Sequence, residues 1–78
     1  MSRWKRPLRA AEVRKILKEL GFTLRPQKST GHEHWVREGN PFRKVTLSAH
    51  NEPFDDFIVG SMARQAGVSV RAFFDALK

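Results

Sequence analysis

The side chains of this chain best suited to proton transfer are its three histidines. His32 and His34 follow Gly31 in the basic segment KSTGHEHW, and His50 ends a later alternating run, VTLSAH. A free imidazole titrates near neutral pH, so it can accept or donate a proton under physiological conditions. Gly31 lacks a side chain, which lets the backbone beside His32 approach a ligand closely. His32 could act as a general acid or base, although the spacing alone favours an ordinary surface histidine at a strand end.

Basic residues lie close to the histidines in the sequence. Lys28, Arg25 and Arg37 could hold a phosphate near His32 through charge-assisted hydrogen bonds. Together with Gly31 and His34, they make up the candidate nucleic-acid-binding set: Lys28, Arg25, Arg37, Gly31 and His34.

A metal site formed by His32, His34 and His50 is a competing interpretation, because residues two apart on a strand face the same way. Glu33 would point away in an extended segment, so no carboxylate is placed to orient the imidazoles. We therefore expect no metal and no cofactor.

The charge of the chain points to polyanionic partners. Its 78 residues include 15 Lys and Arg against 8 Asp and Glu, which gives a formal net charge of +7 and a pI near 10.9. Phosphate contacts release condensed counterions, and an acidic protein could use the same field. There is no cysteine, no apolar run near the roughly 20 residues that span a bilayer, and no signal-peptide pattern. We expect one soluble, cytoplasmic domain over residues 1–78, with residues 1–7 as a flexible basic lead.

Hydrophobic periodicity predicts a helix, three strands and two more helices. The first helix begins at Pro7, carries an apolar stripe and ends at Gly21; strands follow at 22–25, 32–37 and 43–49, the first of them at an edge before Pro26. Residues 38–41 form a hairpin turn. We expect Trp35 to face the core, which turns His32 and His34 toward solvent.

The C-terminal part reads as two helices. Apolar residues recur at helical spacing from Pro53 to Gly67, namely Phe54, Phe57, Ile58, Met62 and Ala66. Ser69 is a good N-cap for a short last helix with Phe73 and Phe74. The run 63–77 also has the spacing of a helix-turn-helix, in which Arg71 would read DNA, although a helix pair that closes the core explains the same spacing better.

Several of these features together resemble the HicA-type toxins of bacterial toxin–antitoxin systems. They are the helix end Leu20-Gly21-Phe22, Gly31-His32 with Trp35 three residues later, the strand running to His50, and Ala66-Gly67-Val68. The resemblance implies an α+β fold like the double-stranded RNA-binding domain, α-β-β-β-α with a short extra helix and a three-stranded antiparallel sheet. It also implies a metal-independent endoribonuclease that cleaves mRNA, with His32 as the catalytic histidine and a HicB-type antitoxin as partner.

The start of the second helix departs from the family pattern. Relatives carry a basic stretch there, whereas this chain has Asp55-Asp56. These carboxylates predict weaker RNA contact from that helix. Two alternatives to the nuclease therefore stay open: a non-catalytic nucleic-acid-binding module, and a degenerate toxin that only binds its antitoxin.

Overall fold

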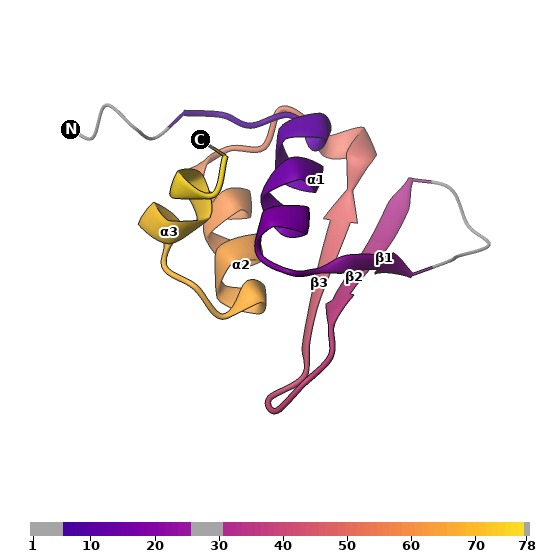
Figure 1. Ribbon diagram of the computed structural model, residues 1–78. Helices are drawn as coiled ribbons and strands as arrows, with labels where there is room; N and C mark the ends of the chain where they lie inside the picture. The colour runs from indigo at the N-terminus through magenta and orange to yellow at the C-terminus, as the bar shows by residue number, and fades with distance from the viewer. Residues whose placement is uncertain (1–5, 26–30, 78) are drawn as a thin grey trace.

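The computed structural model describes residues 6–25 and 31–77 and contains one three-stranded antiparallel sheet with helices on one side of it (Figure 1). The elements are α1 (Ala10–Glu19), β1 (Thr23–Arg25), β2 (His32–Arg37), β3 (Arg43–Ser48), the 3-10 turn η1 (Ala49–Asn51), α2 (Asp56–Ala66) and α3 (Val70–Asp75). The predicted α+β order, α-β-β-β-α with a short extra helix, is confirmed. Residues 1–5 of the basic lead and Lys28 lie outside the described residues.

The first helix begins three residues later than predicted. Leu8 pairs with Phe54 through two backbone hydrogen bonds of 3.1 and 2.7 Å, so the chain is still extended after Pro7. Arg9 is the N-cap, and its backbone N–H donates to the Glu12 carboxylate at 2.9 Å. The prediction of a helix start at Pro7 was wrong because this long-range bridge, which local sequence does not reveal, holds Leu8 in place.

The sheet has the order β1-β2-β3, so β1 lies at an edge as predicted. In β2 and β3, Trp35 pairs with Val45 and His32 with Ser48. β3 ends at Ser48 instead of residue 49, because the chain turns there into η1. Side chains alternate along a strand, and Trp35 is 2% exposed, which confirms that it faces the core.

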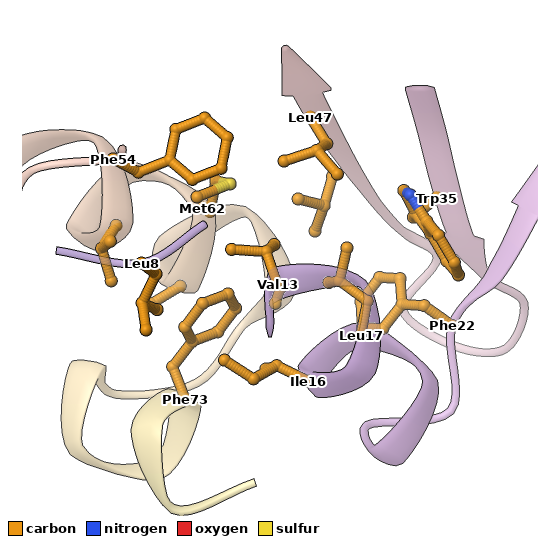
Figure 2. Close-up of a cluster of buried hydrophobic side chains, with 14 of the residues drawn as sticks. Leu8, Val13, Ile16, Leu17, Phe22, Trp35, Leu47, Phe54, Met62 and Phe73 are labelled. Carbon is orange, nitrogen blue, oxygen red and sulfur yellow. The ribbon is translucent and has the colours of Figure 1, made fainter. Parts of the chain in front are cut away.

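The core fills the space between the helices and the inner face of the sheet (Figure 2). α1 contributes Val13, Ile16 and Leu17 to it, at the spacing of one helical stripe. The larger side chains that complete this cluster are Leu8, Phe22, Trp35, Leu47, Phe54, Met62 and Phe73.

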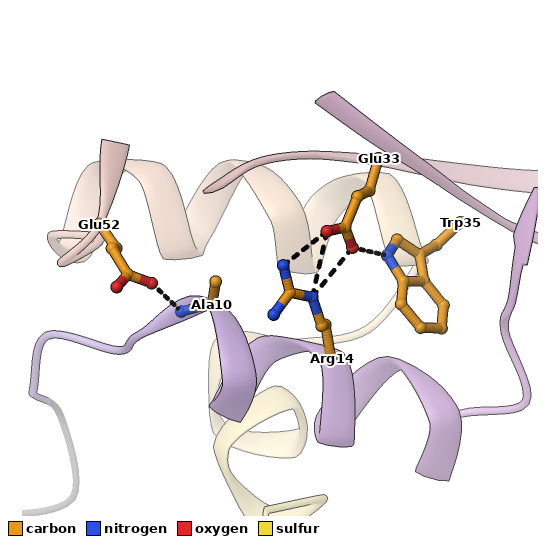
Figure 3. A network of polar contacts seen from close by, with 5 residues as sticks. All are labelled: Ala10, Arg14, Glu33, Trp35 and Glu52. Atoms are coloured by element: carbon orange, nitrogen blue, oxygen red, sulfur yellow. Dashed lines mark hydrogen bonds and ion pairs between the residues drawn. The ribbon is translucent and has the colours of Figure 1, made fainter. Parts of the chain in front are cut away.

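A polar network joins α1 to β2 at the border of the core (Figure 3). The Arg14 guanidinium donates to both carboxylate oxygens of Glu33, at 2.6 Å from Nη2 and 3.1 Å from Nε, and Trp35 Nε1 donates to the same carboxylate at 3.1 Å. These bonds, those from Arg14 above all, hold the pKa of the Glu33 carboxyl below its usual value. The network fixes how β2 is oriented against α1.

The last two helices have defined caps. Asp55 accepts a hydrogen bond from the Ile58 N–H at 3.0 Å and is the N-cap of α2, Gly67 ends that helix with φ +80°, and Ser69 caps α3. Phe57, which we expected on the apolar stripe, is 83% exposed.

Phe54 is buried, but it lies ahead of α2 in the bridge to Leu8. The expectation that Phe54 and Phe57 are both apolar positions of this helix was therefore wrong. Phe73 and Phe74 in α3 are buried against the core, so this helix packs on the core as the helix-pair interpretation expects.

Candidate functional site

The sheet face turned away from the helices, here called the outer face, gathers polar side chains. Because Glu33 and Trp35 point toward α1, their neighbours His32 and His34 point to the outer face. The strand register extends this face into three cross-strand rows: Arg25 with His34 and Thr46, Thr23 with Val36 and Lys44, and His32 with Ser48. The prediction that both histidines of β2 point away from the core is confirmed.

His32 lies at the end of the outer face where β2 begins. It is exposed, and its Nδ1 lies 3.1 Å from the hydroxyl oxygen of Ser48, its cross-strand partner. The hydroxyl can serve as donor or acceptor, so this contact orients the imidazole in either tautomer. Because Nδ1 faces Ser48, Nε2 is the ring nitrogen that a bound ligand would contact.

Gly31 and His50 complete this end of the sheet. The Ala49 N–H donates to the Gly31 carbonyl at 2.9 Å, and the His50 ring lies against the α-carbon of Gly31, where a Cβ atom would overlap it. Gly31 has φ +89°, a conformation that L side chains rarely adopt. Glycine is the residue that tolerates both this positive φ and the close contact with the His50 ring. We call Gly31, His32, Ser48 and His50 together the histidine corner.

His34 lies one pleat farther along β2. Its Nδ1 is 3.5 Å from the Thr46 hydroxyl, and the ring is partly buried. Arg25 on the edge strand is its other cross-strand partner and is exposed. Arg25, His34 and Thr46 form a row that could contact a phosphate next to the histidine corner.

The structure does not bring Arg37 to this row. Arg37 has the same parity on β2 as Trp35 and lies on the helix side of the sheet. Its Nη1 donates to the Leu20 carbonyl at 3.3 Å, and its guanidinium stands 5.2 Å from the centroid of the Phe22 ring. Arg37 thus caps the end of α1 and stacks on an aromatic side chain.

Sequence reasoning missed Ser48 and Thr46, the hydroxyl partners of the histidines. The signal that could have found them was the hairpin: once 32–37 and 43–49 are paired, one register places a hydroxyl opposite each imidazole. His50 was expected at the end of a neighbouring strand, and the structure places it in η1, directly after β3.

The histidine corner contains side chains of the types that general acid–base catalysis uses. It combines two exposed imidazoles with a hydroxyl that orients one of them. In residues 6–25 and 31–77, no group of three or more His, Asp or Glu side chains could hold a metal ion. Over the same residues, no helix is both long and apolar enough to cross a membrane.

Comparison with known proteins finds one family. Residues 10–68 match the family described as the HicA toxin of bacterial toxin–antitoxin systems. The match runs from the first residue of α1 past the glycine that ends α2, and so it includes the histidine corner and the whole sheet. No curated protein matches this chain.

Proposed function

Since this chain belongs to the HicA toxin family of bacterial toxin–antitoxin systems, we propose that it is an endoribonuclease that cleaves mRNA, with His32 as its catalytic group. The position of His32 carries the proposal: the ring is exposed at the rim of the sheet, and Ser48 orients it. A structural histidine would not need such access to ligands.

His32 acts by moving a proton. With Nδ1 at the Ser48 hydroxyl, Nε2 takes the proton from the oxygen that attacks phosphorus. A positioned imidazole of this kind typically accelerates a reaction by about 10²–10⁴-fold, which suits a slow nuclease that acts on many sites. The reaction needs no metal ion, because the imidazole supplies the proton transfer and basic side chains offset the phosphate charge.

RNA docks on the outer face of the sheet. Arg25 and Lys44 stand there on the two edge strands. His34 on the central strand and Thr46, two residues after Lys44 on β3, add hydrogen-bonding groups. Lys28, from the sequence between β1 and β2, belongs to the same proposed set. The net charge of +7 draws RNA to the protein without reading its sequence.

The partner that silences the toxin is a HicB-type antitoxin. A protein that covers the histidine corner would exclude RNA from His32, and acidic side chains on it would meet the basic outer face.

One of the two acidic residues at the start of α2 has a structural role. Asp55 is the N-cap of that helix, where its carboxylate accepts a hydrogen bond from the Ile58 N–H. This role accounts for the presence of Asp55 without assuming a degenerate toxin.

Controlled expression in bacteria tests the proposal. Wild type should arrest growth and shorten bulk mRNA, whereas His32→Ala expressed to the same level should do neither. Co-expression of the HicB-type protein should restore growth. If the wild type leaves mRNA intact, the nuclease assignment is wrong and a binding module becomes the better account.

A further inference from the structure

We infer that His50 is a second catalytic residue, the general acid that protonates the leaving oxygen while His32 acts as the base. The inference rests on the proposed nuclease function and extends it from one histidine to a pair. Three observations carry it: where the His50 ring lies, what else lies at that end of the sheet, and what the cleavage reaction requires.

The His50 ring lies against Gly31, the neighbour of His32, at one end of the β2–β3 pair. The ring packs on the α-carbon of Gly31, the residue before His32. The hydrogen bond from the Ala49 N–H to the Gly31 carbonyl fixes η1 against the start of β2 at 2.9 Å. His32 is tied to the same end through Ser48, two residues before His50. His32 and His50 therefore both lie at this end of the β2–β3 pair.

His50 is also exposed, like His32, although it packs on Gly31. A ring that served only to fill the core would be buried, and the core cluster in the described residues contains no histidine. A Cβ at position 31 would overlap Nε2 and Cδ2 of this ring, so this edge of the imidazole lies against the Gly31 backbone. An exposed imidazole next to the residue that precedes His32 is placed to donate a proton to a ligand bound there.

Cleavage of RNA by its own 2′-hydroxyl requires a base and an acid. The base removes the 2′-hydroxyl proton as the O2′–P bond forms, and the acid gives a proton to O5′ as the P–O5′ bond breaks. The products are a 2′,3′-cyclic phosphate and a free 5′-hydroxyl, with no other reactant consumed. A single imidazole can hold only one of these protonation states at a time, whereas two imidazoles serve both steps in one turnover.

His34 fits the role of the acid less well than His50. It lies farther along β2, is partly buried, and has its Nδ1 at the Thr46 hydroxyl. Its cross-strand neighbour Arg25 places it in the row proposed to hold phosphate. His50 instead adjoins the residue that precedes His32.

A substrate with an altered leaving group tests the assignment. The two substrates are an RNA oligonucleotide and the same oligonucleotide with sulfur in place of the bridging 5′ oxygen at one linkage. A thiolate leaves without protonation, so the sulfur substrate does not need a general acid. Single-turnover cleavage at that linkage is measured for the wild type, His50→Ala, His50→Gln and His32→Ala, with Asn51→Ala as a matched control in the same exposed turn.

We expect His50→Ala and His50→Gln to cleave the oxygen substrate about 10²-fold or more slowly than the wild type. Both should cleave the sulfur substrate within a few-fold of the wild-type rate. His32→Ala should be slow on both substrates, and Asn51→Ala should match the wild type. Circular dichroism of each variant verifies folding.

Equal slowing of the His50 variants on both substrates would overturn the inference and leave His50 as a positioning residue. Cleavage of the oxygen substrate by the His50 variants at the wild-type rate would overturn it as well. Both results leave the nuclease proposal standing, because His32→Ala tests that separately. Absence of cleavage by the wild type would instead overturn the proposed function, and this inference with it.

Discussion

The Nδ1 atom of His32 lies 3.1 Å from the Ser48 hydroxyl, across the β2–β3 pair. The contact links the proposed catalytic ring to a strand that is itself fixed in the core through Val45 and Leu47. A side chain held from a rigid strand keeps its orientation better than one on a loop. Ser48 is thus expected to control how often the His32 ring is in position to react.

Ser48→Ala should lower kcat by about 10-fold with little change in KM, because it frees the His32 ring without removing a substrate contact. Ser48→Thr retains the hydroxyl and should recover most of the activity. Steady-state kinetics on an RNA oligonucleotide measure both constants. If Ser48→Ala raises KM and leaves kcat unchanged, Ser48 binds RNA and does not position His32.

Gly31→Ala should destabilise the protein and slow cleavage. The φ of +89° strains any L side chain by about 1–2 kcal/mol, and the new Cβ would also displace His50. Gly21→Ala is the matched control, because it has φ +91° but meets its nearest neighbour, Arg37 Cδ, at an ordinary 3.5 Å.

Urea unfolding separates the two effects of Gly31→Ala. The stability loss beyond that of Gly21→Ala reports the overlap with His50, and His50→Ala in the Gly31→Ala background should recover that excess. Equal losses of stability in Gly31→Ala and Gly21→Ala, with no recovery when His50→Ala is added, would show that the His50 ring does not overlap a Cβ at position 31.

The Arg14–Glu33 ion pair should make stability depend on pH in the acid range. The pKa of Glu33 is lowered in the folded state, so its contribution is complete above the ordinary carboxyl value of 4.5 and is lost as pH falls through the folded-state pKa. Glu33→Gln should cost about 1–2 kcal/mol at pH 7, and the cost should shrink as the pH falls below 4.5. Urea unfolding of both proteins at several pH values gives the difference, and a difference that does not change with pH would contradict the assignment.

Arg25 and Arg37 should respond differently to the same substitution. Arg25→Gln should weaken RNA binding and reduce the slope of log K against log salt by about one, as expected for one lost phosphate contact. Arg37→Gln should leave that slope unchanged and lower stability instead, because it loses the Leu20 carbonyl and the Phe22 ring. Salt titrations of RNA binding distinguish these outcomes, and a reduced slope for Arg37→Gln would place Arg37 in the interface.

The strand alternation in the sequence showed that Trp35 and the two β2 histidines face opposite sides, and it left two orientations open. The preference for the large apolar Trp35 inside the core gave the orientation that the structure confirms. The same alternation sends Arg37 inward, so including it in the phosphate-binding set conflicted with the pattern itself. Nearness along the chain was the wrong guide there, because neighbouring residues of a strand face opposite sides.

Other features depend on contacts between distant segments. The Leu8–Phe54 bridge moved the start of α1 from Pro7 to Ala10, and no local propensity indicates it. The fit of His50 against Gly31 likewise depends on the register of β2 with β3 and on the turn that follows. Periodicity predicts the elements, but register and turns decide which side chains meet.

The central claim is that His32 is catalytic, and the most direct test compares purified wild type with His32→Ala on one labelled RNA, following cleavage and binding in the same samples with a metal chelator present. The account predicts that His32→Ala binds RNA as the wild type does and cleaves it at least about 10²-fold more slowly. Cleavage by His32→Ala at the wild-type rate would contradict the account.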